Sequence, residues 1–240
     1  MGNQESEQKM GLRLARRAYV YNLMHVIFGV EPDCEILERA FNEQTVDTLD
    51  ALEKECADRV DDCAQCCHNA CIAVRKIIDL ESRELVDEFQ DDYSKLFVAP
   101  GDTYVRQWES SYIGKEGMVF QDSTLDVRSF YHDAGLKLVA EKRFPDDHLA
   151  AMMDYLGRLS ERAYDEFADG DDKAVLVTLD VQTRFLHCHV LTWVDAFASK
   201  VVECDERGRY AAFAGLLAAF AHYDYAAVEL MKRELGDNLI

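Results

Sequence analysis

Hydrophobic residues recur at every third or fourth position along most of this chain, which is the spacing of an amphipathic helix. The pattern predicts helices over residues 9–29, 32–41, 45–79, 82–96, 123–135, 147–168, 173–204 and 209–235. The alternating run Ala174–Leu179 resembles a strand, but a single strand has no partner, so we assign it to a helix. With only 3 Pro and 12 Gly, the chain is predicted to be an all-α, single-domain bundle of roughly 8–11 helices over residues 1–240.

Several helix ends are predicted from individual residues. Gly29 indicates a helix stop, and Ser82 indicates a helix N-cap. Ser123 and Asp126 have the spacing of a capping box. Residues 45–79 contain neither Pro nor Gly, so they form one long helix or a helix that is broken once.

Residues 98–121 have the least regular pattern in the chain. They contain the helix breakers Pro100, Gly101, Gly114 and Gly117, with Trp108 and Tyr112 among them. A connection of this length in a helical protein is often functional. We therefore expect a hinge or a binding loop at 98–121.

The net charge of the chain indicates which kinds of binding partner it can attract. The chain carries 26 Lys and Arg against 46 Asp and Glu, a formal net charge of −20. This balance argues against nucleic acid and anionic membranes, which require a basic surface, and favours a cationic partner such as an arginine-bearing peptide. No run of about 18 apolar residues is present, so no membrane insertion is expected. Because the N-terminus is too polar for a signal peptide, we expect a cytoplasmic protein with reduced cysteines.

Cysteines cluster in one predicted helix, at Cys56, Cys63, Cys66, Cys67 and Cys71. Cys63 and Cys66 have metal-ligand spacing, and Cys67 and Cys71 lie on one helix face. The same thiols also suit a helix interface as small apolar groups. Because no second Cys-x-x-Cys motif accompanies them, we favour packing. A metal-binding or redox protein that uses Cys63, Cys66, Cys67 and Cys71 is the alternative.

No motif of an enzyme or of a phosphate-binding loop is present. Asp146 and Asp147 lie at a predicted helix start, where N-capping accounts for Asp146. Asp147 and His148 have no nucleophile or oxyanion motif beside them, so we expect no enzyme and no cofactor. His187 and His189 are two residues apart, which indicates ordinary polar or interface histidines.

One aromatic stripe follows helical spacing, at Phe185, His189, Trp193 and Phe197. A stripe of this kind is usually part of the core. Trp193 is also a candidate for the edge of a groove.

Five segments, in order, resemble motifs of the TorD/DmsD/NarJ family of redox-enzyme maturation chaperones. They are Tyr93–Gly101 (YSKLFVAPG), Trp108–Tyr112 (WESSY), Phe120–Leu125 (FQDSTL) followed by Arg128, Pro145–Leu149 (PDDHL) and Phe185–Trp193 (FLHCHVLTW). Arg17–Met24 also resembles the start of that family.

The resemblance implies an all-α, cytoplasmic chaperone that binds the leader of a molybdoenzyme precursor, usually a twin-arginine signal peptide. Such a chaperone holds the precursor until its molybdenum cofactor is installed, and some members form homodimers by exchanging helices. The implied leader site includes the loop of Trp108 and Tyr112 together with Pro145, Asp147 and His148. The full set of candidate peptide-binding residues is Trp108, Glu109, Ser111, Tyr112, Asp122, Ser123, Arg128, Pro145, Asp147, His148 and Trp193.

The charge of the chain agrees with this expectation. An acidic protein attracts the cationic head of a twin-arginine leader, and an aromatic groove accepts the apolar stretch behind it. The candidate carboxylate partners for the arginines are Asp122, Asp126, Asp146 and Asp147.

Overall fold

The computed structural model describes residues 2–79, 84–114, 122–137 and 145–237 of the chain. These residues form α1 (Gly2–Gly29), α2 (Cys34–Ala40), α3 (Glu43–Ala57), α4 (Asp62–Ile78), α5 (Glu84–Tyr93), α6 (Ser110–Ile113), α7 (Asp122–Asp133), α8 (Leu149–Ala168), α9 (Asp172–Phe185), α10 (Val194–Cys204) and α11 (Arg209–Asp237), with π-helical segments η1 (Ser94–Val98) and η3 (Leu186–Val190). The predicted all-α bundle is confirmed. That residues 1–240 form one unit with a hinge or loop at 98–121 stays a prediction.

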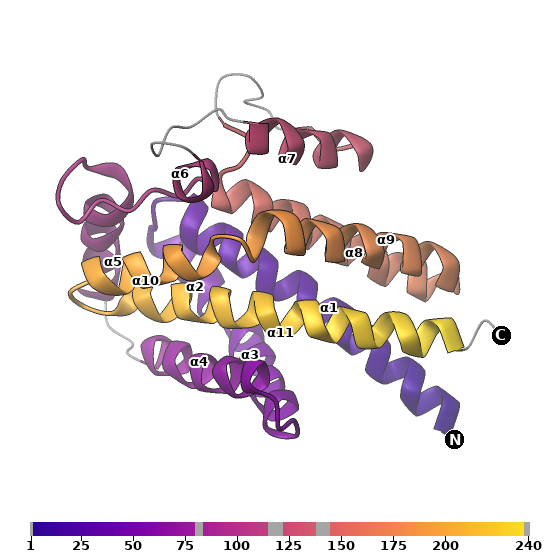
Figure 1. Cartoon of the computed structure of the whole chain (residues 1–240). Coiled ribbons are helices and arrows are strands. Elements are labelled where there is room, and N and C mark those ends of the chain that lie inside the picture. The colour runs from indigo at the N-terminus through magenta and orange to yellow at the C-terminus, as the bar shows by residue number, and fades with distance from the viewer. Residues whose placement is uncertain (1, 80–83, 115–121, 138–144, 238–240) are drawn as a thin grey trace.

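The two longest helices, α1 and α11, form the centre of the bundle (Figure 1). α1 packs along α8, and α11 packs against α4 and α10. The α3–α4 pair lies on one side of this centre, and α6 and α7 lie on the opposite side, at the top of Figure 1. The segment before α6 and the Pro-Asp-Asp-His motif before α8 therefore lie on the same side of the bundle as α7.

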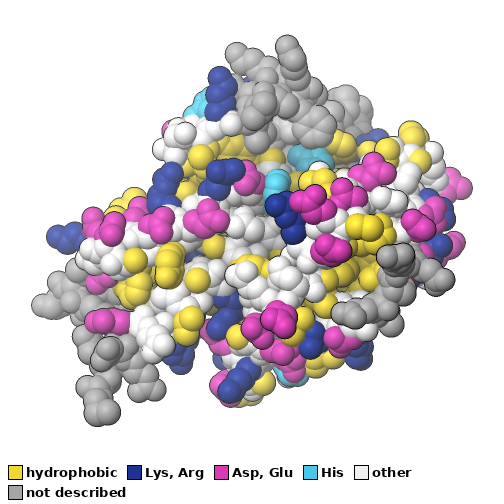
Figure 2. Space-filling model, turned by 180° about the vertical axis from the view of Figure 1, so that it is seen from behind, with side chains coloured by type: hydrophobic (Ala, Val, Ile, Leu, Met, Phe, Trp, Pro, Cys, Tyr) yellow, Lys and Arg dark blue, Asp and Glu magenta, His cyan; other side chains and the backbone are white. Residues whose placement is uncertain are grey.

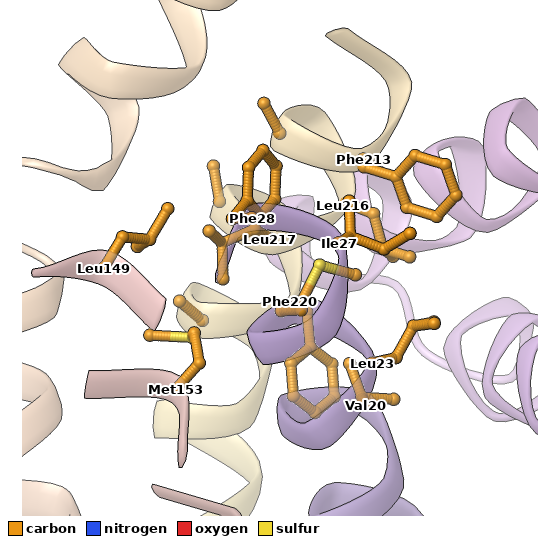
Figure 3. Packing of buried hydrophobic residues seen from close by; sticks show 14 of the residues in the cluster. Val20, Leu23, Ile27, Phe28, Leu149, Met153, Phe213, Leu216, Leu217 and Phe220 are labelled. Atoms are coloured by element: carbon orange, nitrogen blue, oxygen red, sulfur yellow. The ribbon is translucent and has the colours of Figure 1, made fainter. Parts of the chain in front are cut away.

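The main core is built where α1, α8 and α11 face one another. Figure 3 shows side chains from these three helices pointing into a shared interior. The labelled residues are Val20, Leu23, Ile27, Phe28, Leu149, Met153, Phe213, Leu216, Leu217 and Phe220. Burial of this apolar surface is the main favourable contribution to folding.

Glycine allows α1 and α8 to approach closely. A Cβ added at Gly29 would lie 2.7 Å from the Cβ of Ala150, and one added at Gly157 would lie 2.4 Å from Asn22 Oδ1. The first neighbour is a rigid methyl group, whereas the second is the end of a flexible side chain. Gly29 is therefore required by the packing of α1 against α8.

Several predicted helix ends are confirmed. Asp33 caps α2, because Ile36 N donates to Asp33 Oδ1 at 2.8 Å. The predicted 45–79 helix is broken once, and Asp61 caps α4 after the break by accepting from Ala64 N at 2.9 Å. The run Ala174–Leu179 is helical, as expected.

The prediction of one helix over 173–204 was wrong. The chain turns at residues 191–193, between η3 and α10. Trp193 Nε1 donates to His189 O at 2.6 Å, and Trp193 N donates to Val190 O at 3.2 Å. In a continuous helix His189 O would accept from Trp193 N. The indole takes that acceptor, and the helix is interrupted.

The predicted capping box was also wrong. Ser123 is the second residue of α7, which begins at Asp122, so Ser123 lies inside the helix and not at its N-cap. The predicted N-cap Ser82 lies outside the described residues.

α11 is more apolar than expected from the absence of an unbroken apolar run in the sequence. Among the described residues, Arg209–Gly236 is the one helix long and apolar enough to cross a membrane by length and composition, and 56% of its apolar window is buried in the bundle. A core helix has the same composition. The absence of membrane insertion stays a prediction.

Candidate functional site

The predicted loop and the Pro-Asp-Asp-His motif meet beside the start of α8. Trp108 and His148 form an isolated antiparallel bridge, and their rings lie 5.2 Å apart at 78°. The same short pairing includes a hydrogen bond from Glu109 N to Asp147 O at 3.1 Å. Two segments that the sequence places far apart thus form one local structure.

Gln107 fixes this structure to the bundle. Its buried side chain donates from Nε2 to Phe28 O, at the end of α1, at 2.9 Å. Its backbone O accepts from Leu149 N, the first residue of α8, at 2.8 Å. The segment before α6 is therefore anchored to both α1 and α8.

The side chain of Asp147 accepts hydrogen bonds from both α6 and α7. It is fully buried. Its Oδ2 accepts from Ser110 N at 2.8 Å, at the start of α6, and its Oδ1 accepts from Thr124 Oγ1 at 2.9 Å, in α7. Both carboxylate oxygens are engaged inside the protein, so Asp147 positions the two helices that surround it.

Asp146 is held by α7 and does not cap α8, which corrects the sequence-based interpretation. It is buried, Arg128 Nε donates to its Oδ2 at 2.9 Å, and Arg128 Nη2 donates to the same oxygen. Its backbone O accepts from Tyr131 OH at 3.0 Å. Arg128 thus neutralises Asp146. Neither Asp146 nor Asp147 has the exposure expected of a partner for an external arginine.

His148 is the N-cap of α8. Its Nδ1 accepts a hydrogen bond from Ala150 N at 3.2 Å, so this nitrogen carries no proton. Burial lowers the pKa of His148 to about 4, although Asp147 acts in the opposite direction. A histidine whose pKa is this low remains uncharged near neutral pH, where it offers an aromatic, polar contact.

A second buried histidine connects three elements. His189, in η3, places Nδ1 3.1 Å from Glu109 Oε2 and Nε2 3.2 Å from Asp126 Oδ2. Glu109 is fully buried, and burial raises its pKa while the hydrogen bond and charge of His189 lower it. From the sequence, His189 is interpreted as an ordinary polar or interface histidine and also as a member of the aromatic stripe. Its signal was its place in the FLHCHVLTW motif.

Trp193 lies in the core, as favoured for the aromatic stripe, and not at the alternative position on a groove edge. It is 1% exposed, and its ring stands 5.2 Å from Tyr112 and 5.8 Å from Phe197. Tyr112 is half-buried and donates from OH to Arg106 O at 2.8 Å. Desolvation raises the pKa of Tyr112 above its ordinary value. Tyr112 therefore keeps an edge toward solvent, whereas Trp193 supports it from behind.

The structure brings all eleven candidate residues into one region but gives them different exposure. Asp122 is exposed. The half-buried side chains are Trp108, Ser111, Tyr112, Ser123, Arg128 and His148. The buried ones are Glu109, Pro145, Asp147 and Trp193. Only the first two groups present atoms that a peptide can contact without rearrangement of the core.

The cysteine cluster divides into buried and accessible thiols. Cys56, Cys67 and Cys71 are buried between α3 and α4. Hydrogen bonds with the other two thiols, followed by burial, raise the pKa of Cys67. Cys63 is half-buried and Cys66 is exposed. In the part of the chain that the structure describes, no group of three or more His, Cys, Asp or Glu residues is arranged to hold a metal.

Comparison with known proteins identifies the family. The family model described as nitrate reductase delta subunit matches residues 50–199. A chaperone protein TorD from Shewanella sp. (strain ANA-3) is 27% identical over 221 residues, which covers 89% of this chain and 94% of that protein. A TorD from Photobacterium profundum is also 27% identical, over 58% of this chain and 63% of its own length.

Among solved structures, a redox enzyme maturation protein from Archaeoglobus fulgidus is similar to this chain, with 18% identity and a TM-score of 0.48 over 86% of this chain and 93% of that one. The family match covers more than half of the chain, and the TorD relatives are named chaperones. The chain therefore belongs to the TorD/DmsD/NarJ family of redox-enzyme maturation chaperones.

Proposed function

We propose that this protein is a cytoplasmic chaperone without catalytic turnover that binds the twin-arginine leader of a molybdoenzyme precursor. It holds the precursor until the molybdenum cofactor is inserted. The observation that carries the proposal is the Trp108–His148 bridge, which places two half-buried rings side by side at the junction of α6, α7 and α8. Aromatic rings at such a junction accept the apolar part of a leader and the planar face of arginine.

Carboxylates of α7 are the proposed partners of the leader arginines. Asp122 is exposed, and the side chain of Asp126 is 63% exposed. Asp126 is also tied to the site through His189. These two replace the buried Asp146 and Asp147 as candidates for bidentate pairing with guanidinium.

The surface charge supports attraction over longer distances. Figure 2 shows acidic side chains spread over one face of the molecule, with Lys and Arg side chains between them. A net charge of −20 steers a cationic leader toward the chaperone, and salt weakens that attraction.

Calorimetry with a synthetic leader peptide tests the proposal. We expect a twin-Arg peptide to bind at least about tenfold more tightly than its Lys-Lys variant, because lysine lacks the guanidinium fork. The D122N/D126N double variant should weaken binding about tenfold. The E43Q/D47N variant removes the same charge from exposed positions of α3 and should change it less than about twofold.

Equal affinity for the two peptides would argue against arginine recognition. In cells, the precursor enzyme should fail to acquire its metal centre when this protein is deleted. Normal cofactor insertion in the deletion strain would contradict the proposed role in maturation.

A further inference from the structure

A groove rich in cations lies between α1 and α3, on a chain that is strongly acidic overall. Its volume is about 380 Å³. The basic residues that line it are Lys9, Arg13, Arg16, Lys54 and Arg59, and the acidic ones are Glu55 and Asp58. This local excess of positive charge opposes the net charge of the protein and is remote in the fold from the α6–α8 junction.

Two guanidinium groups in the groove, those of Arg13 and Arg16, form ion pairs with the carboxylate of Glu55. Arg13 Nε lies 3.2 Å from Glu55 Oε1, and Arg16 Nη1 pairs with Glu55 Oε2. Arg13 Nη1 also lies 3.3 Å from Glu234 Oε2, and Arg59 Nε pairs with Asp61 at 2.8 Å. Because a guanidinium has five N–H donors, these carboxylates still leave donors of the arginines for a further anion. Lys9 and Lys54 are exposed, and neither has an acceptor among the described residues.

A buried cation lies directly behind the groove. A recess of about 20 Å³ shares Arg13, Arg16 and Glu55 with the groove and is also lined by Arg17. Arg17 is 4% exposed and pairs with Asp224 through Nε at 2.6 Å and Nη2 at 3.1 Å. Its Nη1 has no hydrogen-bond partner among the described residues. Buried N–H groups are rarely left in this state, and the recess that Arg17 lines shares three residues with the groove.

We propose that this groove binds a small soluble ligand that carries two or more phosphate groups. Guanidinium forks match phosphate oxygens, and cations on both walls suit more than one phosphate. Leu12 and Ala51 supply apolar wall for the organic part, and the volume lies within the ~300–1,000 Å³ range of small-molecule sites. A phosphate-bearing membrane must approach a whole face of a protein whose net charge is −20, and that charge repels it, whereas a small anion meets the local excess of cations in the groove. Glu55, which pairs with both Arg13 and Arg16, occupies the place that we assign to one phosphate.

Titration with inorganic pyrophosphate, followed by calorimetry and by amide NMR shifts of α1 and α3, tests the proposal without any leader peptide. E55Q removes the internal competitor and should tighten binding about threefold or more. K9Q/K54Q should weaken it about threefold or more. The controls carry equal charge changes outside the groove. D47N, on α3, should tighten binding less than E55Q, and the double variant K173Q/K200Q, on α9 and α10, should leave it unchanged.

Several outcomes would overturn the proposal. One is equal tightening by D47N and E55Q, since that is a net-charge effect alone. Others are amide shifts that fall outside α1 and α3, and a glutamate-rich peptide that binds the groove more tightly than pyrophosphate, since the ligand would then be a protein segment. If E55Q does not fold, the lysine pair and its control decide the question.

Discussion

His189 and Glu109 are joined by a hydrogen bond of 3.1 Å between two side chains that are almost entirely buried. The residues come from η3 and from the segment that leads into α6. Their pairing links the late aromatic motif to the loop that carries Trp108. It also gives the buried Glu109 carboxylate the counter-charge or donor that a buried acid requires.

Loss of this pairing should destabilise the fold. In H189A the Glu109 carboxylate remains buried without its partner, and we expect the free energy of unfolding to fall by about 3 kcal/mol. The control is H222A, which removes an exposed histidine that lies 2.9 Å from Asp195, and it should cost less than about 0.5 kcal/mol. Urea unfolding of both variants measures the difference, and equal costs would contradict a special role for His189.

His148 should make stability depend on pH. Its pKa is lowered to about 4 in the folded protein, against about 6.5 in an unfolded chain. The unfolded state therefore binds more protons between these values, so stability falls as pH decreases from about 6.5 toward 4. H148N keeps a capping acceptor but cannot titrate. Relative to H148N, the wild type should lose about 2 kcal/mol between pH 7.5 and pH 4.5, and parallel pH profiles in urea unfolding would refute this.

Two glycines of α1 should respond to alanine in opposite ways. In G29A the new methyl group meets the Ala150 Cβ at 2.7 Å, and the forced separation of α1 from α8 should cost about 2 kcal/mol. At Gly11 the nearest atom to an added Cβ is at 3.7 Å, so G11A should stabilise the helix by about 0.5–1 kcal/mol. Thermal melts of the two variants give the comparison. A neutral G29A would show that the helices separate at little cost.

The buried thiols should behave as packing groups. C67S places a hydroxyl among apolar neighbours and should cost about 2 kcal/mol, whereas C66S, at an exposed position, should change stability by less than about 0.5 kcal/mol. A strong chelator should leave Tm unchanged. A stoichiometric metal in protein purified without oxygen, lost in C63S/C67S, would instead establish the metal site.

Helical periodicity was sufficient to predict the all-α fold and most helix ends. Trp193 shows where it fails, because the competing acceptor of its indole, His189 O, is defined only by tertiary packing. The site residues were found through motif resemblance, which names residue types without their burial. The sequence therefore could not separate the inward-facing Asp146 and Asp147 from the exposed Asp122, since their partners Arg128 and Thr124 lie on another helix.

Residues 107–109 pair in antiparallel fashion with residues 147–149. The chain between these two segments therefore forms an excursion that leaves the bundle and returns to it at the same place. This pairing holds both ends of the segment that carries α6 and α7 at one point beside the start of α8. α6 and α7 lie on that excursion, whereas the α1–α8–α11 interior does not. Val127 and Tyr131 of α7 belong to the main core, so α7 is held both at this pairing and by buried contacts with the rest of the bundle. We therefore expect a peptide to bind against the exposed face of α7 without displacing this helix.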